Sequence, residues 1–263
     1  MAKREGWTGW DEYAPFYDWE NAQTLGRRDV PFWRQIAAQA KGRVLELGSG
    51  TGRISLPLAR AGISVVGVDR SAPMLIQAAR RARLLRRRRD GKTRPRLRLV
   101  RSDIRALPFG DASFVMALAP YGILQSLLRD RDLAATLASV SRVVKRGGLL
   151  GIDLVPDVPN WREYTNQVRM RGRTKDGAHL TLIESVRHDR SRKLTIFEQS
   201  YRERRGRQTT EHRFDLTFRT LSFPQMTRRL ERAGFQIEAV LGDYRGGPWD
   251  ERADVWVILA RRT

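Results

Sequence analysis

The chain lacks cysteine and has only three histidines among its 263 residues. Without cysteine no disulfide bond can form, which favours an intracellular setting, and thiolate metal sites are excluded. A run of about 18 apolar residues, the length of a membrane-spanning helix, is also absent, and no apolar signal core follows the first residues. We therefore expect a cytoplasmic protein with no membrane partner and no bound metal.

Acidic residues are few compared with basic ones, because 29 Asp and Glu accompany 50 Lys and Arg, for a formal charge of +21. Twelve basic residues lie between Arg80 and Arg101, beside the single acid Asp90. Such a cluster is typical either of a surface that contacts nucleic acid or of a solvated helix end in an arginine-rich protein. Internal repeats and linkers rich in Pro, Gly or Ser are absent too, so the length predicts one domain with an insertion.

A glycine-rich turn follows the first apolar strand pattern. Val44–Leu47 is typical of a buried parallel strand, Gly48, Gly50 and Gly52 lie in the turn, and a helix is expected from Ile54. Glycine lets the backbone approach a ligand closely, and a helix N-terminus leaves amide groups unpaired. The turn therefore predicts a binding site for a polar ligand.

Two details distinguish this turn from the one that binds dinucleotides. Its spacing is G-x-G-x-G, whereas the dinucleotide turn places the third glycine three residues after the second. Glu46 precedes Gly48 by two residues, where it would repel a pyrophosphate and attract a cation. The second strand, Ser64–Val68, ends in Asp69, nineteen residues after Gly50, and this position suits a carboxylate that binds both ribose hydroxyls.

Two further apolar runs end in residues that could face the same ligand. Leu97–Val100 leads to Ser102–Ile104, and Phe114–Leu118 leads to Ala119–Tyr121. The carboxyl ends of parallel strands face one crevice in a doubly wound sheet, so four strand ends converge there. The pattern predicts an α/β fold with a Rossmann-like sheet.

These motifs, in this order, resemble those of the class I S-adenosylmethionine (SAM) dependent methyltransferases. Glu46–Gly52 resembles their first motif, Val68–Leu75 their second, Ser102–Phe109 their third, and Val144–Gly148 their Lys-x-Gly-Gly turn. The resemblance runs over nearly the whole chain. It implies a seven-stranded sheet with the last strand antiparallel, SAM as the cofactor and S-adenosylhomocysteine as the product.

The same resemblance implies a cofactor site. Glu46 and the glycines would hold the methionine part of SAM, Asp69 its ribose, and Asp103 with Ile104 its adenine. The full set of expected cofactor-binding residues is Tyr17, Trp33, Glu46, Gly48, Ser49, Gly50, Asp69, Arg70, Met74, Ser102, Asp103, Ile104 and Ala119.

An insertion with strand-like alternation follows the fifth strand, Leu149–Leu154. Leu180–Ile183, Leu194–Phe197 and Phe214–Phe218 are rich in strand-forming residues. Turn signals separate them at 175–177, 189–191 and 205–206. We predict four antiparallel strands that form a roof over the crevice.

After the insertion the chain is expected to return to the main sheet. A helix over Ser222–Ala233, stopped by Gly234, precedes strands Phe235–Leu241 and Asp254–Ala260. Hairpin pairing would place the last strand antiparallel at the edge of the sheet. The expected domains are 1–158 for the SAM-binding core with an N-terminal helical cover, 159–221 for the antiparallel roof, and 222–263 for the rest of the core.

The roof resembles that of a bacterial subgroup of class I methyltransferases, which includes amino-sugar N,N-dimethyltransferases. The segments Tyr13–Trp19 and Arg28–Trp33 also resemble that subgroup. In such enzymes this region covers the donor, so the resemblance makes Tyr13, Tyr17 and Trp33 candidates for contact with SAM or the acceptor. Core packing is the alternative for each of these aromatic residues.

No catalytic group is assigned from the sequence, although Tyr17, Tyr121 and His212 are candidates. His212 shares its strand parity with Phe214, so it either points into the crevice or packs in the core. Tyr121 offers a ring on which a planar acceptor can stack. Many relatives carry a histidine shortly after the fourth strand, where this chain has Ser126, so the resemblance supplies no general base.

We predict that the protein transfers a methyl group from SAM to a small-molecule acceptor. Nitrogen is favoured over oxygen, because an amine needs only to lose its proton whereas a hydroxyl benefits from a base. An RNA methyltransferase that uses the basic cluster is the alternative, although Leu118 stands where nucleic-acid amino-methyltransferases have Asn or Asp. A SAM-binding regulator without catalysis is a third interpretation.

Overall fold

The computed structural model describes residues 7–24, 29–87, 96–155, 163–250, 253 and 255–263. The chain divides into two compact units. The larger, here the core unit, comprises Arg27–Leu124, Arg129–Pro156 and Leu221–Thr263. The smaller, here the meander unit, comprises Met1–Gly26, Gln125–Leu128 and Asp157–Thr220. Within the described ranges, no helix is long and apolar enough to cross a membrane.

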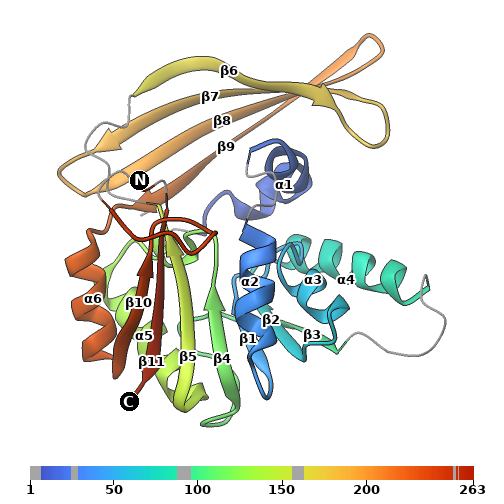
Figure 1. Cartoon of the computed structure of the whole chain (residues 1–263). Helices are drawn as coiled ribbons and strands as arrows, with labels where there is room; N and C mark the ends of the chain where they lie inside the picture. The colour runs from blue at the N-terminus through green and yellow to red at the C-terminus, as the bar shows by residue number, and fades with distance from the viewer. Residues whose placement is uncertain (1–6, 25–28, 88–95, 156–162, 251–252, 254) are drawn as a thin grey trace. The chain divides into compact units, whose positions relative to one another are not determined.

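The core unit contains a seven-stranded sheet in the order β10-β11-β5-β4-β1-β2-β3 (Figure 1). The strands are β1 (Val44–Leu47), β2 (Val65–Asp69), β3 (Leu97–Arg101), β4 (Phe114–Ala119), β5 (Val144–Leu154), β10 (Phe235–Leu241) and β11 (Trp256–Arg262). The first five are parallel where they pair, and β11 is antiparallel to both of its neighbours. The predicted Rossmann-like sheet with an antiparallel last strand is confirmed.

The predicted place of the last strand at the sheet edge is wrong. β11 lies between β5 and β10, with Trp256 opposite Leu154 on one side and Val257 opposite Leu241 on the other. Most of β11 is buried on both faces, including Val257 and Ile258. β10 is largely half-exposed and occupies the edge. A strand with two buried faces is stabilised by neighbours on both sides, so the burial pattern suits the observed order.

Another difference concerns the turn predicted at Val144–Gly148. β5 begins at Val144, which pairs with Phe114, and the ladder resumes at Leu149 opposite Met116. The residues between these two pairs shift the register of the strand, and Gly147 among them has a φ of +71°. The glycines thus serve a bulge inside a strand, which needs the same backbone freedom as a turn.

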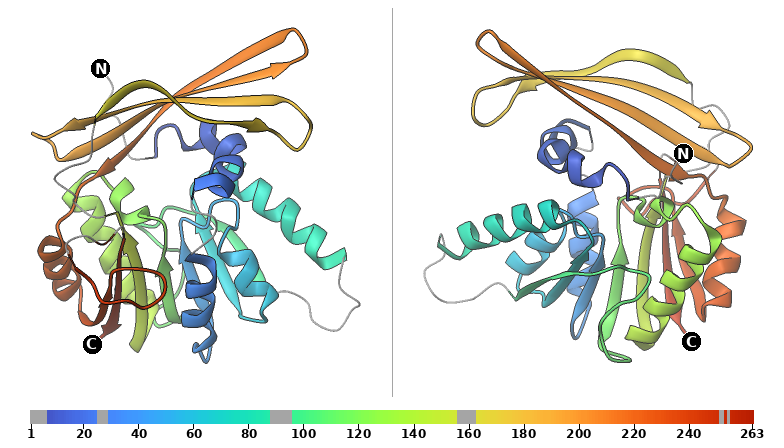
Figure 2. Two further views of the ribbon diagram at one scale, coloured as in Figure 1. Left: turned by 45° about the horizontal axis from the view of Figure 1, so that its top comes forward. Right: turned by 180° about the vertical axis from the view of Figure 1, so that it is seen from behind.

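Helices cover both faces of the core sheet. They are α2 (Asp29–Ala38), α3 (Ser55–Arg60), α4 (Ala72–Arg87), α5 (Asp130–Val143) and α6 (Phe223–Arg232), with a short 3-10 turn η1 at Ile123–Ser126. Figure 1 shows α2 in front of the sheet, and the view from behind in Figure 2 shows α5 on the other face. Beneath α2, a hydrophobic cluster joins Phe32 and Trp33 to Val44, Met116 and Leu118. This packing fixes the strands whose ends carry the predicted site.

The meander unit contains helix α1 (Trp10–Thr24) and four antiparallel strands in sequential order. The strands are β6 (Tyr164–Arg173), β7 (His179–Asp189), β8 (Leu194–Arg205) and β9 (Gln208–Arg219). One sheet face carries aromatic side chains that pack on α1, where the rings of Phe16 and Tyr201 stack with centroids 4.2 Å apart. The four predicted strands are therefore confirmed, and the described part of the N-terminal segment belongs to the same unit as they do.

Candidate functional site

The glycine-rich turn after β1 is held against the end of β2. The Gly50 amide donates a 2.7 Å hydrogen bond to Oδ2 of Asp69, and the Ser49 amide donates one of 2.9 Å to the Val68 carbonyl. Gly50 has a φ of +52°, a conformation that glycine adopts without steric cost. A Cβ atom there would meet no atom closer than 3.9 Å. The turn therefore leaves open space beside its backbone.

Asp69 also connects the turn to β3. Its Oδ1 accepts a 2.8 Å bond from the Ser71 amide, and its carbonyl accepts a 3.0 Å bond from the Ser102 amide. The structure thus brings together the turn and the residues expected at the ends of β2 and β3. Parallel strands place their carboxyl ends at one edge, which explains why segments distant in sequence meet here.

Asp103 lies at the same edge within a network of charges. Arg70 contacts its carboxylate at 3.1 Å, and Arg105 contacts it at 2.7 Å while also reaching Asp132 at 2.9 Å. Partial burial opposes ionisation, but hydrogen bonds from Arg105 and the charges of Arg105 and Arg70 hold the pKa of Asp103 below its usual value. Asp103 is therefore a fixed anion.

Glu46 is a buried carboxyl group under the turn. Only 2% of its surface is exposed, and its carboxylate accepts a hydrogen bond from the Ser55 hydroxyl. Burial raises the pKa of Glu46 to about 8, although the Ser55 hydrogen bond and the charge of Arg53 oppose the shift. A cation bound nearby would lower this pKa, so the ionisation of Glu46 depends on whether a positively charged ligand is bound.

Arg53 links the turn to α2 and to the end of β4. Its Nη1 contacts both carboxylate oxygens of Asp29 at 2.6 Å, and Asp29 is fully buried. The guanidinium carbon lies 5.0 Å from the ring centroid of Tyr121. Tyr121 and Gly122 both have left-handed backbone conformations, with φ values of +62° and +61°. A non-glycine residue held in this region is strained and is often found at a functional site.

Asp153 on β5 fixes that strained turn. Its Oδ1 accepts a 2.8 Å bond from the Gly122 amide, and its Oδ2 accepts a 2.8 Å bond from the Tyr244 hydroxyl. Burial raises the pKa of Asp153 to about 6, against the effect of these two hydrogen bonds. Sequence reasoning missed this residue, although an ionisable side chain inside the apolar run Leu149–Leu154 was a usable signal.

The other residues predicted in the core unit differ in their surroundings. Met74 and Ala119 are buried, Ile104 is half-buried, and the Arg70 side chain is 49% exposed. Trp33 is fully buried in the hydrophobic cluster, with its ring centroid 5.0 Å from that of Phe32. Its Nε1 has no hydrogen-bond partner among the described atoms, so packing describes the ring and the predicted ligand contact of Trp33 stays a prediction.

Two of the catalytic candidates lie in the meander unit, whereas Tyr121 lies in the core unit. Tyr17 is buried, with its ring centroid 5.5 Å from that of Tyr13. His212 lies 5.1 Å from the ring of Phe16, and its Nε2 is 3.9 Å from Glu203. His212 therefore points to the face that packs on α1, as its strand parity predicts.

A half-buried carboxylate on α1, Glu20, was not found from the sequence. It accepts hydrogen bonds from the hydroxyls of Tyr13, at 2.9 Å, and Tyr201. Burial raises the pKa of Glu20 despite both of these hydrogen bonds. No local pattern signals the contact with Tyr201, because the two residues are 181 positions apart in the chain.

The edge of the core sheet can hold the cationic methyl donor expected from the sequence. The buried Oγ of Ser49 has no hydrogen-bond partner among the described atoms, and buried polar groups are nearly always bonded. Asp69 supplies negative charge beside the open backbone at Gly50, and Glu46 would add to it once a bound cation lowers its pKa. Among the residues that the structure describes, no three His, Asp or Glu side chains are grouped to hold a metal ion.

Comparison with known proteins identifies the domain around this edge. Residues 44–148 match a family model described as "Methyltransferase domain". A demethylmenaquinone methyltransferase of Paenarthrobacter aurescens is 32% identical over 195 residues, which cover 68% of this chain and 70% of that protein.

Solved structures share the fold over nearly the whole length. The CcbJ methyltransferase of Streptomyces caelestis superposes with a TM-score of 0.79 at 21% identity, covering 99% of this chain and 100% of that one. SAM-bound CalS10, an amino pentose methyltransferase of Micromonospora echinaspora, gives a TM-score of 0.62 at 19% identity, with 97% and 92% covered.

The raised pKa of Glu46 predicts a pH-dependent stability difference. The pKa of an unfolded Glu is 4.5, whereas the pKa of Glu46 in the folded protein is about 8. The folded state therefore binds more protons between these values, and wild-type stability falls as pH rises through this window. Glu46→Gln removes the ionisation and keeps an acceptor for Ser55.

We expect Glu46→Gln to gain stability relative to wild type from pH 5 to pH 8, by on the order of 3 kcal/mol. Urea unfolding at unit steps of pH measures the difference. The exposed Glu231→Gln is the matched control and should show no such trend. Parallel profiles for Glu46→Gln and wild type would contradict the raised pKa.

Proposed function

This chain belongs to the SAM-dependent methyltransferases, and we propose that it methylates an amine nitrogen of a small molecule. The observation that carries this proposal is the charge at the strand ends of the core sheet. In a protein with a formal charge of +21, this edge gathers the carboxylates of Asp69, Asp103 and Asp153. It also holds Glu46, which is mostly protonated at neutral pH until a cation binds nearby. A carboxylate-lined edge favours cationic ligands, which include both a sulfonium donor and an ammonium acceptor.

The donor is assigned to the turn and the neighbouring strand ends. The open backbone at Gly50 and the Ser49 hydroxyl would bind its methionine part, with Glu46 balancing positive charge. Asp69 would accept hydrogen bonds from the ribose hydroxyls while its present contacts with Gly50 and Ser71 keep it in place. Asp103, held by Arg105, would lie at the adenine end.

The donor supplies an activated methyl group, so the chain's own task is placement. Holding an acceptor in line with the methyl group and excluding water can account for much of the rate enhancement. The rigid elements for this task are the Asp153-fixed turn at Tyr121 and Gly122 and the Arg53–Asp29 ion pair. Tyr121, held under Arg53, would form one wall of the acceptor site.

An amine fits this edge better than a hydroxyl. Asp153 has a pKa of about 6, so it is mostly ionised at neutral pH and favours a nearby positive charge. Both of its oxygens already accept hydrogen bonds, so it serves as a fixed charge and not as a base. A hydroxyl acceptor would need such a base, whereas an amine loses its proton to water before it attacks.

The names of the relatives include both a quinone precursor and an amino pentose as acceptors. Both are small molecules, which supports that class of acceptor for this chain.

RNA is disfavoured, because phosphates would be repelled by the carboxylates at the strand ends. The basic cluster between Arg80 and Arg101 lies partly outside the described residues, and its described helical part is the second half of α4. That half leads away from the carboxyl end of β2, where α4 begins.

The test of the proposed function is a panel of amines, each paired with the alcohol of the same skeleton. We expect release of S-adenosylhomocysteine with an amine, and a kcat/KM that rises about tenfold per pH unit below the pKa of that amine, because the free base is the nucleophile. The panel is read by the rate of S-adenosylhomocysteine formation. Faster turnover of the matched alcohol would rule out the amine.

The donor assignment predicts a loss of affinity in Asp69→Ala. Each hydrogen bond to a charged carboxylate contributes about 1.5–3 kcal/mol, so SAM should bind at least about tenfold more weakly. Calorimetric titration measures the affinity. Asp111→Ala is the control, since Asp111 is 79% exposed and lies in the loop before β4, at the opposite end of the sheet. Unchanged affinity in a folded Asp69→Ala variant would remove the ribose assignment.

The basic cluster separates a small acceptor from RNA. Changing Arg86, Arg87, Arg88 and Arg89 to Gln should leave kcat/KM for the small acceptor within about twofold, because an uncharged or cationic acceptor is not attracted by added cations. If the acceptor is RNA, the variant loses four phosphate contacts. The slope of log affinity against log salt concentration should then become shallower by about three to four units. Methylation rates measured between 50 and 200 mM salt distinguish the two results.

A further inference from the structure

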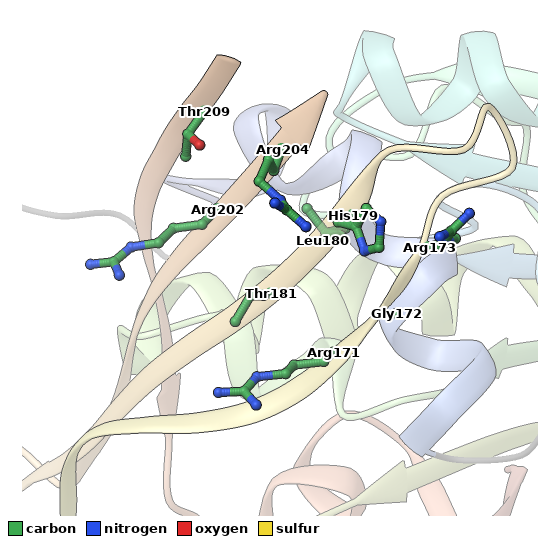
Figure 3. A pocket seen from close by; sticks show the side chains of 9 residues that line it. All are labelled: Arg171, Gly172, Arg173, His179, Leu180, Thr181, Arg202, Arg204 and Thr209. Atoms are coloured by element: carbon green, nitrogen blue, oxygen red, sulfur yellow. The ribbon is translucent and has the colours of Figure 1, made fainter. Parts of the chain in front are cut away.

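The meander sheet carries a hollow on the face opposite α1. Its volume is about 540 Å³, within the range of small-molecule sites. The residues that line it are Arg171, Gly172, Arg173, His179, Leu180, Thr181, Arg202, Arg204 and Thr209. Figure 3 shows Arg171 and Arg202 extending to the same side of the sheet from strands on either side of Thr181. Four arginines in one small hollow make it strongly cationic.

The strand register places these cations in two rows. Arg171, Thr181 and Arg202 lie opposite one another across β6, β7 and β8. Arg173, His179 and Arg204 form the next row on the same face. Strand spacing puts the two arginines of a row about 10 Å apart at their backbones, and the rows about 7 Å apart. Long guanidinium side chains can close both gaps around one ligand.

Most of these cations are not neutralised by the protein. Among the described residues, Arg171, Arg173 and Arg204 have no carboxylate within 4.0 Å, and Arg202 contacts only Glu211, at 3.5 Å. Like charges that share one sheet face destabilise it. The four arginines around this hollow therefore repel one another, and a bound anion would reduce that repulsion.

One acidic side chain lies beside the hollow on the same face. Glu211 on β9 is opposite Arg202 in the strand register, and it pairs with Arg202 at 3.5 Å and with Arg213 at 2.9 Å. A long polyanion that crosses β9 would meet this carboxylate, whereas a small anion between the two rows of arginines would not. This arrangement favours a small anion.

We propose that this hollow binds a small oligophosphate, a ligand class with two or more linked phosphate groups such as a nucleoside triphosphate. Guanidinium groups bind phosphate oxygens through paired hydrogen bonds, and each row of arginines engages one phosphate group. The hydroxyls of Thr181 and Thr209 add neutral donors. The site lies in the meander unit and is independent of the methyl-transfer site proposed above.

Calorimetric titration of the full chain with sodium tripolyphosphate and, separately, ATP without magnesium tests this proposal at low salt. We expect saturable binding of one oligophosphate per chain, with inorganic phosphate at least tenfold weaker. Arg171→Gln with Arg202→Gln should weaken oligophosphate binding at least tenfold. Arg60→Gln with Arg228→Gln, both exposed in the core unit, makes the same change of net charge and should shift affinity less than twofold.

Thermal unfolding provides a second measurement that guards against a folding defect. Without ligand, Arg171→Gln with Arg202→Gln should melt no lower than wild type, because repulsion is removed. Tripolyphosphate should raise the melting temperature of wild type and of the control pair, but not that of Arg171→Gln with Arg202→Gln. Equal loss of affinity in the control pair would overturn the proposal. Binding of oligouridylates that strengthens with length, with no saturable tripolyphosphate binding, would also overturn it in favour of an RNA surface.

Discussion

The hydrogen bond from the Gly50 amide to Asp69 is the contact on which the site of the core unit depends. It closes the glycine-rich turn onto the end of β2 at 2.7 Å, and Asp69 in turn accepts the amides of Ser71 and, through its carbonyl, Ser102. Three strand ends are thereby tied together before any ligand binds. A site organised in this way loses little conformational freedom on binding, which is how preorganisation contributes to affinity.

The carboxylates around this contact oppose stability and serve binding. Burial raises the pKa values of Glu46 and Asp153, which means that ionising either group in the folded protein costs free energy. The bonds from Ser55, Gly122 and Tyr244 offset only part of it. A cationic ligand offsets more, so the same groups that weaken the fold strengthen its complex. Such trade-offs are common where a fold carries a site.

The sequence predicted what depends on local pattern. The G-x-G-x-G spacing located the turn, alternation located the meander strands, and Gly234 marked the end of α6. Non-local contacts were not predictable in this way. Arg53 reaches Asp29 over 24 positions and Tyr244 reaches Asp153 over 91, and no periodicity reports such pairs. The prediction that the last strand lies at the sheet edge was wrong for the same reason. Strand order depends on the burial of both faces, and the hairpin that joins β10 to β11 does not determine which of the two lies at the edge.

The net charge of the chain does not determine which ligand the strand ends of the core sheet favour. The formal charge of +21 describes the whole chain, yet the strand ends of the core sheet gather carboxylates while arginines gather on one face of the meander sheet. Electrostatic attraction decays within about 8–10 Å at physiological salt, so a ligand responds to the side chains beside it and not to the total. A basic protein can therefore hold a cation at one place and an anion at another. What each place binds follows from its own charges and from how far they are buried.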